Sequence, residues 1–153
     1  MAPTDRESTK HPSFAVSADV VLLTTQGERL MVLLVRRGRD PFQGRWALPG
    51  GFVDIEEDLE HAALRELEEE TALRLPELRQ LGAYGRPDRD PRMRVVTVAF
   101  WGYITDPGEP SGGDDAAEAR FWPVDQVLSE REMLAFDHHQ IVSDGLTAHQ
   151  APR

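Results

Sequence analysis

The sequence predicts a single domain of mixed α/β (α+β) class, on the basis of three observations. Segments with the alternation or apolar content of strands outnumber segments with helical periodicity. The two kinds of segment follow one another in mixed order, which favours helices packed on a sheet over separate α and β parts. The length of 153 residues is typical of one domain with its own core.

The first part of the chain predicts a hairpin followed by a loop. Residues 1–13 are polar and contain two prolines, so we expect a flexible tail ahead of a domain that covers residues 14–147. Apolar runs at 14–25 and 29–37 flank a Gln-Gly pair, which is the pattern of two antiparallel strands joined by a tight turn. Glycine and proline recur in the stretch that follows, which we expect to form a loop.

Two helices and three further strands are expected in the remainder. The strongest helical periodicity covers residues 58–73 and stops before a proline. Apolar and aromatic content predicts strands at 78–85, 95–104 and 119–124, separated by charged or glycine-rich loops. A last helix is expected within residues 124–147, and residues 148–153 are expected to be a flexible end.

Composition and charge exclude several classes of function. The formal net charge of −10 predicts repulsion from nucleic-acid backbones and anionic membranes, so we expect neither as a partner. The chain has no cysteine, which excludes disulfides, thiolate zinc sites and cysteine nucleophiles. It shows neither a membrane-spanning apolar run nor a signal peptide, so a cytoplasmic location is expected. An anionic substrate would need a local positive charge, for which a metal cation is the obvious candidate.

The predicted helix at 58–73 places acidic side chains on the face that should pack against the core. At about 100° per residue, Glu66 and Glu70 fall on the same face as Ala63 and Leu67, and Glu69 lies at its edge. Such carboxylates repel one another, and burying them unpaired is costly. One interpretation is an ordinary solvated acidic face. The other, favoured by the flexible Pro-Gly-Gly backbone just upstream, is a site that holds Mg²⁺ or Mn²⁺ against a phosphorylated ligand.

The residues around this helix resemble a known motif. Gly51 is followed after five residues by Glu57, then after seven more by Arg65-Glu66-Leu67, any residue, Glu69-Glu70, any residue and Ala72-Leu73. This pattern resembles the Nudix box at every defined position except Ala72, where the box has glycine. The wider stretch from about Phe14 to Ile141 is also similar to Nudix domains.

The resemblance implies a Nudix-type α/β/α sandwich with a mixed central sheet, and metal-dependent hydrolysis of a nucleoside diphosphate linked to another moiety. It implies Mg²⁺ or Mn²⁺ as cofactor, with the metal ligands Gly51 (through its carbonyl), Glu66, Glu69 and Glu70. Arg65 is expected to orient a helix carboxylate, and Glu57 to support it. The catalytic residues implied are Glu66, Glu69, Arg65 and a general base on the loop before 119–124. Counting back from Phe121 favours Asp115 as that base, over Asp114, Glu118 and Glu109.

A second stretch indicates which diphosphate is cleaved. The loop from Gly85 to Arg92 is stiffened by two prolines and carries three arginines, which suit bidentate contacts to phosphate. An exposed loop with self-paired charges is the alternative interpretation. Together with RRGRDPFQGRWALPGG and LAFDHHQI, this loop resembles the Nudix subfamily that contains ADP-ribose pyrophosphatases. The substrate implied is ADP-ribose, cleaved to AMP and ribose 5-phosphate. The substrate-binding residues expected are Arg37, Gly50, Arg86, Asp88, Arg89 and Arg92.

Other aromatic and histidine residues have less specific interpretations. Tyr84, Phe100 and Trp46 are expected either to stack on adenine or to pack in the core. The adjacent His138 and His139 are expected to be structural or surface residues, because no third metal ligand stands at a suitable spacing.

Two other functions stay open at this point. A nucleoside triphosphate or oxidised-nucleotide pyrophosphatase would use the same box with different specificity loops. A non-catalytic ADP-ribose-sensing module would keep the fold without turnover, although the three helix glutamates argue for catalysis. A homodimer is expected by analogy with relatives alone.

Overall fold

A long hairpin forms the centre of the computed structural model, which describes residues 11–113 and 116–152. Strands β1 (Ala15–Gln26) and β2 (Arg29–Arg37) pair antiparallel next to the turn, from Leu23 opposite Val32 to Gln26 opposite Arg29. This hairpin confirms the one predicted from the sequence. Five more strands join the same sheet: β3 (Trp46–Ala47), β4 (Gly50–Phe52), β5 (Arg79–Tyr84), β6 (Val95–Tyr103) and β7 (Ala116–Pro123).

The sheet is mixed, as predicted. Its strand order is β3-β2-β1-β6-β5, with β4 added to β1 and β7 added to β2. Strand β6 runs parallel to β1, from Ala15 opposite Val95 to Leu23 opposite Tyr103, and the other pairings among these seven strands are antiparallel. The parallel pairing brings the loop before β6 to the same end of the sheet as the start of β1.

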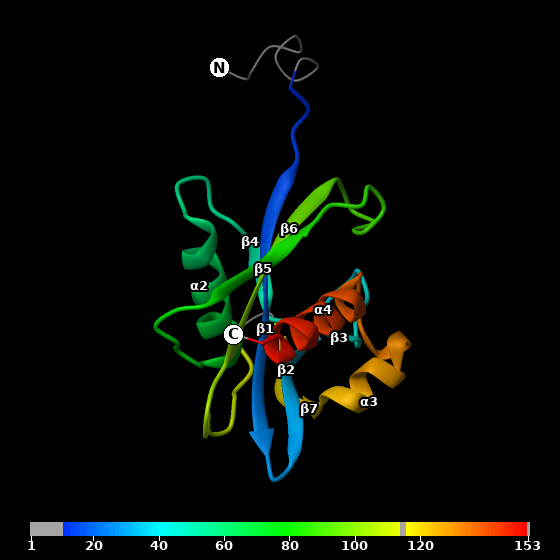
Figure 1. Cartoon of the computed structure of the whole chain (residues 1–153). Coiled ribbons are helices and arrows are strands. Elements are labelled where there is room, and N and C mark those ends of the chain that lie inside the picture. The colour runs from blue at the N-terminus through cyan, green and yellow to red at the C-terminus, as the bar shows by residue number, and fades with distance from the viewer. Residues whose placement is uncertain (1–10, 114–115, 153) are drawn as a thin grey trace.

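Helices cover both faces of the sheet and make it an α/β/α sandwich (Figure 1). The helices are α2 (Leu59–Thr71), α3 (Val124–Ser129) and α4 (His138–Gln150), with a 3-10 turn at Arg131–Met133. Strand side chains alternate between faces. Val20 and Leu22 of β1 pack with the α2 side of the core, whereas Val21 and Leu23 pack with the α3 and α4 side.

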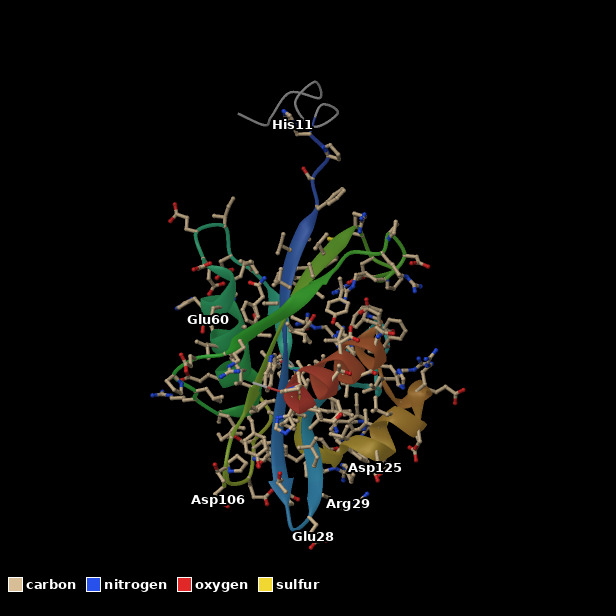
Figure 2. The ribbon with its side chains drawn as sticks, viewed as in Figure 1. His11, Glu28, Arg29, Glu60, Asp106 and Asp125 are labelled. Atoms are coloured by element: carbon tan, nitrogen blue, oxygen red, sulfur yellow. The ribbon has the colours of Figure 1, made fainter. Side chains whose placement is uncertain are left out.

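The C-terminal part of the chain differs most from the sequence-based expectation. The helix expected within 124–147 is two helices, and α4 runs on to Gln150, past the expected end of the domain. The chain between them is held by a backbone hydrogen bond from Ala135 N–H to the Trp46 carbonyl, which stops a continuous helix from forming. Helix α3 is joined to the start of β2 by Arg29, whose Nη2 donates to Asp125 Oδ1 at 3.1 Å (Figure 2). None of the described helices has the length and apolar character needed to cross a membrane.

Helix α2 begins and ends with defined caps. Asp58 Oδ1 accepts a hydrogen bond from Leu59 N–H at 2.7 Å, and Asp58 itself is extended. At the other end Ala72 adopts the left-handed conformation with φ of 63°, and its N–H donates to the Glu68 carbonyl. This is the position at which the Nudix box has glycine, so the helix ends as a glycine would end it, at the steric cost of a Cβ atom.

We expect Ala72→Gly to raise the free energy of unfolding by about 1 kcal/mol, because glycine adopts the left-handed conformation without steric cost. Urea denaturation followed by circular dichroism measures the change. Ala62→Gly is the matched control in the same helix, where glycine is expected to destabilise. An Ala72→Gly variant that is as unstable as the control would contradict the assigned cap.

Candidate active site

A cavity of about 400 Å³ opens where β1 changes partners along one edge. Strand β4 pairs with residues 17–19 of β1, and β2 pairs with residues 23–26, so the two neighbours diverge between these positions. Helix α2, the loop before β6 and the start of α4 complete the walls. The polar, glycine and aromatic residues that line the cavity include Asp19, Arg37, Gly50, Gly51, Phe52, Glu66, Glu70, Arg89, Asp90, Arg92, Phe136 and His138.

Two carboxylates of α2 line this cavity and lack full charge compensation. Burial, together with the nearby Glu66, raises the pKa of Glu70 to about 8, although Gly50 N–H donates to Glu70 Oε2 at 3.4 Å. Burial also raises the pKa of Glu66, even though Arg65 donates to it. Two acids held together in this way favour a cation between them. The expectation that both belong to the inner face of the helix is confirmed by their place in the cavity wall.

Arg65 joins the carboxylates of α2 to the loop before it. Its Nε and Nη2 donate to the two oxygens of Glu57, at 2.6 and 2.8 Å. Its Nη1 donates to Glu66 Oε1 at 2.8 Å and to Glu69 Oε2 at 3.2 Å, and Nη2 also reaches the Phe52 carbonyl at 3.2 Å. The hydrogen bonds from Arg65 lower the pKa of Glu57 to about 2. This geometry fits the supporting roles that the resemblance implied for Arg65 and Glu57.

Glycines let the backbone of β4 approach these carboxylates closely. A Cβ atom added to Gly51 would lie 2.6 Å from Glu66 Oε1, and one added to Gly50 would overlap Asp19 Oδ1 and the Ala18 carbonyl. A side chain at either position would therefore fill the space next to the acids. This space is suited to a small cation, and backbone and carboxylate oxygens are the ligands that Mg²⁺ and Mn²⁺ prefer.

Arginines and aromatic rings also line the cavity. The Arg37 guanidinium lies 5.0 Å from the centre of the Phe136 ring, and Arg92 lies 5.4 Å from Phe52 and 5.8 Å from Phe136. Arg92 also donates to both oxygens of Asp90, which holds its head group in place. The cavity thus holds carboxylates together with arginines and aromatic rings, groups that suit a divalent cation and a nucleotide anion.

The neighbouring Arg89 is anchored from α4. Its side chain is 3% exposed and binds the two oxygens of Asp137 at 2.6 and 2.9 Å. The guanidinium is therefore committed to this ion pair, and its edge forms part of the wall.

Four predicted substrate and catalytic residues that the structure describes lie outside the cavity lining: Arg65, Arg86, Asp88 and Glu69. Arg86 and Asp88 are nearly four-fifths exposed and pair with each other at 3.5 Å, so their contact with substrate stays a prediction. Glu69 has a side chain that is 57% exposed and is bound by Arg65, next to the cavity but outside its lining.

The predicted general base, Asp115, lies outside the described residues, as does Asp114. Of the other two candidates, Glu118 pairs with Arg36 at 3.8 Å and Glu109 is exposed; neither lines the cavity. Gly113, two residues before Asp115, is bound to α2, because its N–H donates to the Glu70 carbonyl at 3.1 Å. The loop therefore meets the end of α2 just before the candidate base.

Sequence reasoning missed several residues of the cavity. Asp19 had one visible signal, since it is a lone charge inside an apolar strand, whereas Phe136 had none. His138 is buried and accepts a hydrogen bond from Leu48 N–H, which agrees with the structural role expected for it. Trp46, Tyr84 and Phe100 do not line the cavity, and all three pack with the core clusters.

The raised pKa of Glu70 predicts a pH-dependent cost in metal-free protein. Folding keeps a proton on Glu70 that the unfolded chain has lost, so its contribution to stability falls as pH rises from the ordinary value of 4.5 towards about 8. In EDTA, we expect Glu70→Gln to gain stability relative to the parent between about pH 6 and pH 8. Thermal unfolding of both proteins across this range measures the difference, and a difference that is independent of pH would contradict the assignment.

Comparison with known proteins places the chain in a family. A family model described as the NUDIX domain matches residues 13–144. The chain belongs to the Nudix family. An ADP-ribose pyrophosphatase of Methanocaldococcus jannaschii is 45% identical over 116 residues, which cover 74% of this chain and 64% of that protein. The chain spans 54–64% of the length of the first three curated relatives that it matches.

Solved Nudix structures share the architecture described above. The NUDIX domain of Shewanella oneidensis NrtR, solved with ADP ribose, is 34% identical with a TM-score of 0.82, and the match covers 97% of this chain and 100% of that one. A bifunctional NMN adenylyltransferase/ADP ribose pyrophosphatase from Francisella tularensis, solved with AMP and an Mn ion, is 26% identical with a TM-score of 0.79. That match covers 94% of this chain and 44% of the other. These likenesses confirm the Nudix-type fold predicted from the box.

Proposed function

We propose that this protein hydrolyses the diphosphate bond of ADP-ribose to AMP and ribose 5-phosphate, with Mg²⁺ or Mn²⁺ as cofactor. The observation that carries the proposal is the cavity itself, in which Glu66 and Glu70 stand against the glycines of β4 and face Arg37 and Arg92. The relatives support the choice of substrate, because one is named an ADP-ribose pyrophosphatase and another was solved with ADP ribose.

The residues present fit a divalent cation bound together with substrate. Glu66, Glu70 and the Gly51 carbonyl are the proposed metal ligands. Glu69, whose carboxylate accepts a hydrogen bond from Arg65, is proposed as a further ligand. Within residues 11–113 and 116–152, no three His, Cys, Asp or Glu side chains form a complete metal site by themselves. Mg²⁺ needs only one or two carboxylates when substrate phosphates supply further oxygens. When bound, it would neutralise the diphosphate and help to orient a water.

The chain's own residues have distinct parts in the proposed mechanism. Arg37 and Arg92 bind phosphate oxygens from the side opposite α2, which offsets the repulsion from a protein of net charge −10. Arg65 fixes the orientation of the Glu66 carboxylate. The general base that takes the proton from the attacking water is proposed to be Asp115, from the loop that follows Gly113.

A sensing role is the second candidate function. It is favoured by the likeness to NrtR and to an ADPR responsive transcriptional repressor of Acinetobacter baylyi, which is 33% identical over 138 residues. Turnover distinguishes the two, because a sensor binds ADP-ribose without consuming it. A triphosphate pyrophosphatase is the third candidate, and it would release inorganic pyrophosphate. The homodimer expected by analogy stays a prediction, which sedimentation would test.

The proposed function is tested by identifying products from a panel of nucleotides with Mg²⁺ present. ADP-ribose, NADH, diadenosine polyphosphates and nucleoside triphosphates are incubated separately with the protein and analysed by ion-exchange chromatography. The proposal expects AMP and ribose 5-phosphate, formed fastest from ADP-ribose. Pyrophosphate formed fastest from a triphosphate would instead indicate a triphosphate pyrophosphatase. Tight binding of ADP-ribose without products would instead indicate a sensing role.

A further inference from the structure

Asp19 is a buried carboxylate in the cavity that the proposed mechanism does not use. Its side chain is 9% exposed, and it belongs to β1 at the point opposite Gly50 of β4. One oxygen, Oδ2, accepts a hydrogen bond from Thr97 Oγ1 at 2.6 Å and lies 3.8 Å from His138 Nε2. Thr97 and His138 are themselves buried, so the carboxylate is held from behind by a fixed framework.

His138 has a defined orientation and protonation. Its Nδ1 accepts the hydrogen bond from Leu48 N–H at 3.0 Å, so the neutral ring carries its proton on Nε2, the nitrogen that faces Asp19. Burial lowers the pKa of His138, which keeps the ring neutral. The neutral ring therefore lies beside Asp19 without cancelling its charge.

The second carboxylate oxygen of Asp19, Oδ1, can accept a hydrogen bond that the described protein residues do not supply. Within residues 11–113 and 116–152, no donor reaches Oδ1, and no arginine or lysine pairs with the carboxylate. The position of Gly50 explains why this oxygen is open, since a Cβ atom there would collide with Oδ1. Asp19 lines the cavity, so a ligand bound there can supply the donor for Oδ1 that the described protein residues do not.

The chemistry of the cavity restricts what that donor is. A phosphate would be repelled by Asp19, which already acts with Glu66 to raise the pKa of Glu70. A neutral O–H group is attracted instead, as at sites where a carboxylate binds a ribose hydroxyl and thereby rejects the phosphorylated sugar. Each ribose of ADP-ribose carries such hydroxyls within a few bonds of the diphosphate.

We propose that Asp19 Oδ1 binds a ribose hydroxyl of the substrate and so determines specificity for an unmodified sugar, with Thr97 and His138 as its positioning residues. This inference rests on the proposed function for the identity of the ligand. It predicts that the protein discriminates against analogues that lack the hydroxyl or carry a phosphate on it. Both riboses carry such hydroxyls, and the experiment below distinguishes them.

The test is titration calorimetry in EDTA, so that binding is measured without turnover. The ligands are ADP-ribose and analogues that each lack one hydroxyl, on the adenosine ribose or on the terminal ribose. We expect Asp19→Asn to weaken ADP-ribose binding by about 10- to 100-fold, the usual effect of losing a hydrogen bond to a charged group. The analogue that lacks the bound hydroxyl should bind the parent protein as weakly as Asp19→Asn binds ADP-ribose. Its affinity should not fall further in the variant. That analogue identifies the hydroxyl.

Controls separate this result from a general disturbance of the cavity. Thr24→Val changes a buried polar residue of the same strand that does not line the cavity, and it is expected to leave every affinity unchanged. Thr97→Val should reduce ADP-ribose affinity in the same pattern as Asp19→Asn, but to a smaller extent. The parent protein alone already tests the proposal through the analogues, so a variant that fails to fold does not remove the test.

Two results would overturn the proposal. One is an equal loss of affinity for ADP-ribose and for every analogue in Asp19→Asn. The other is unchanged ADP-ribose affinity in EDTA together with weaker Mg²⁺ binding in a separate titration without EDTA, which would make Asp19 a residue of the cation site. Parent protein that binds ADP-ribose with this pattern but does not hydrolyse it would contradict the proposed function and leave the role of Asp19 standing. Parent protein that neither binds ADP-ribose in EDTA nor hydrolyses it with Mg²⁺ present would contradict both.

Discussion

Replacing Glu70 with glutamine is expected to lower the rate of ADP-ribose hydrolysis by about 10²- to 10³-fold, the scale seen when one electrostatic contact to a transition state is removed. The substitution keeps the volume of the side chain and removes the charge that the cation requires. Because burial raises the pKa of Glu70 to about 8, the charged form is costly without a cation, so its loss should not unfold the protein. Steady-state kinetics at saturating and limiting Mg²⁺ measure the effect.

Glu68→Gln is the matched control for this prediction. Glu68 lies on the same helix, but its side chain is 46% exposed and pairs with Arg74 on the outer face. The same chemical change there is expected to leave activity within about twofold, since exposed ion pairs contribute little. Full activity of Glu70→Gln at limiting Mg²⁺ would overturn the assignment of Glu70 as a metal ligand.

The second large effect is expected from Arg65→Lys, which should lower kcat/KM by about 10- to 100-fold. Arg65 binds Glu57 with two nitrogens and Glu66 with a third, at 2.6 to 2.8 Å. A lysine ammonium keeps the charge but cannot match this forked geometry, so Glu66 would lose its fixed orientation. The same variant should need a higher Mg²⁺ concentration for half-maximal activity.

Arg74→Lys provides the comparison, because Arg74 is 82% exposed and makes one ion pair on the outer face of α2. We expect its kinetics to match those of the parent protein. If Arg65→Lys also retains parental kcat/KM and Mg²⁺ dependence, Arg65 serves only to stabilise the helix, and the orienting role is wrong. Thermal unfolding of both variants separates a loss of stability from a loss of orientation.

The fold could be predicted from the sequence to the extent that local patterns determine it. Apolar runs on both sides of a tight turn predicted the β1–β2 hairpin, and helical periodicity predicted α2 to within two residues at its end. The break between α3 and α4 could not be predicted in this way. It depends on a contact between Ala135 and Trp46, which are far apart in the sequence.

The candidate site could likewise be predicted only where its residues are close together in the sequence. Residues of the box lie on one helix and the strand before it, so their spacing already indicates that Glu66 and Glu70 share a face. Asp19, Phe136 and His138 reach the same cavity from β1 and from the start of α4. Only the assembled sheet and its covering helices bring these segments together, and no spacing in the sequence encodes that proximity.

The loop before β6 shows that charge composition alone does not predict the environment of each arginine. Its three arginines were expected to contact substrate together, but the structure gives them three environments. Arg86 is exposed and paired with Asp88, Arg89 is buried against Asp137, and Arg92 lines the cavity beside Asp90. Burial therefore distinguishes these guanidinium groups, since the Arg89 side chain is 3% exposed whereas the Arg92 side chain is 39% exposed and lines the cavity.

Metal-dependent cleavage of ADP-ribose is tested most directly by following AMP release while the cation is removed and restored. Purified protein is supplied with ADP-ribose and Mg²⁺, then with excess EDTA, then with excess Mg²⁺, and AMP and ribose 5-phosphate are measured throughout. We expect equal amounts of both products, arrest in EDTA and recovery with Mg²⁺. With Mg²⁺ present, Glu70→Gln is expected to form both products far more slowly than the parent protein. Product formation that continues unchanged in EDTA, or no AMP at any stage, would contradict metal-dependent cleavage.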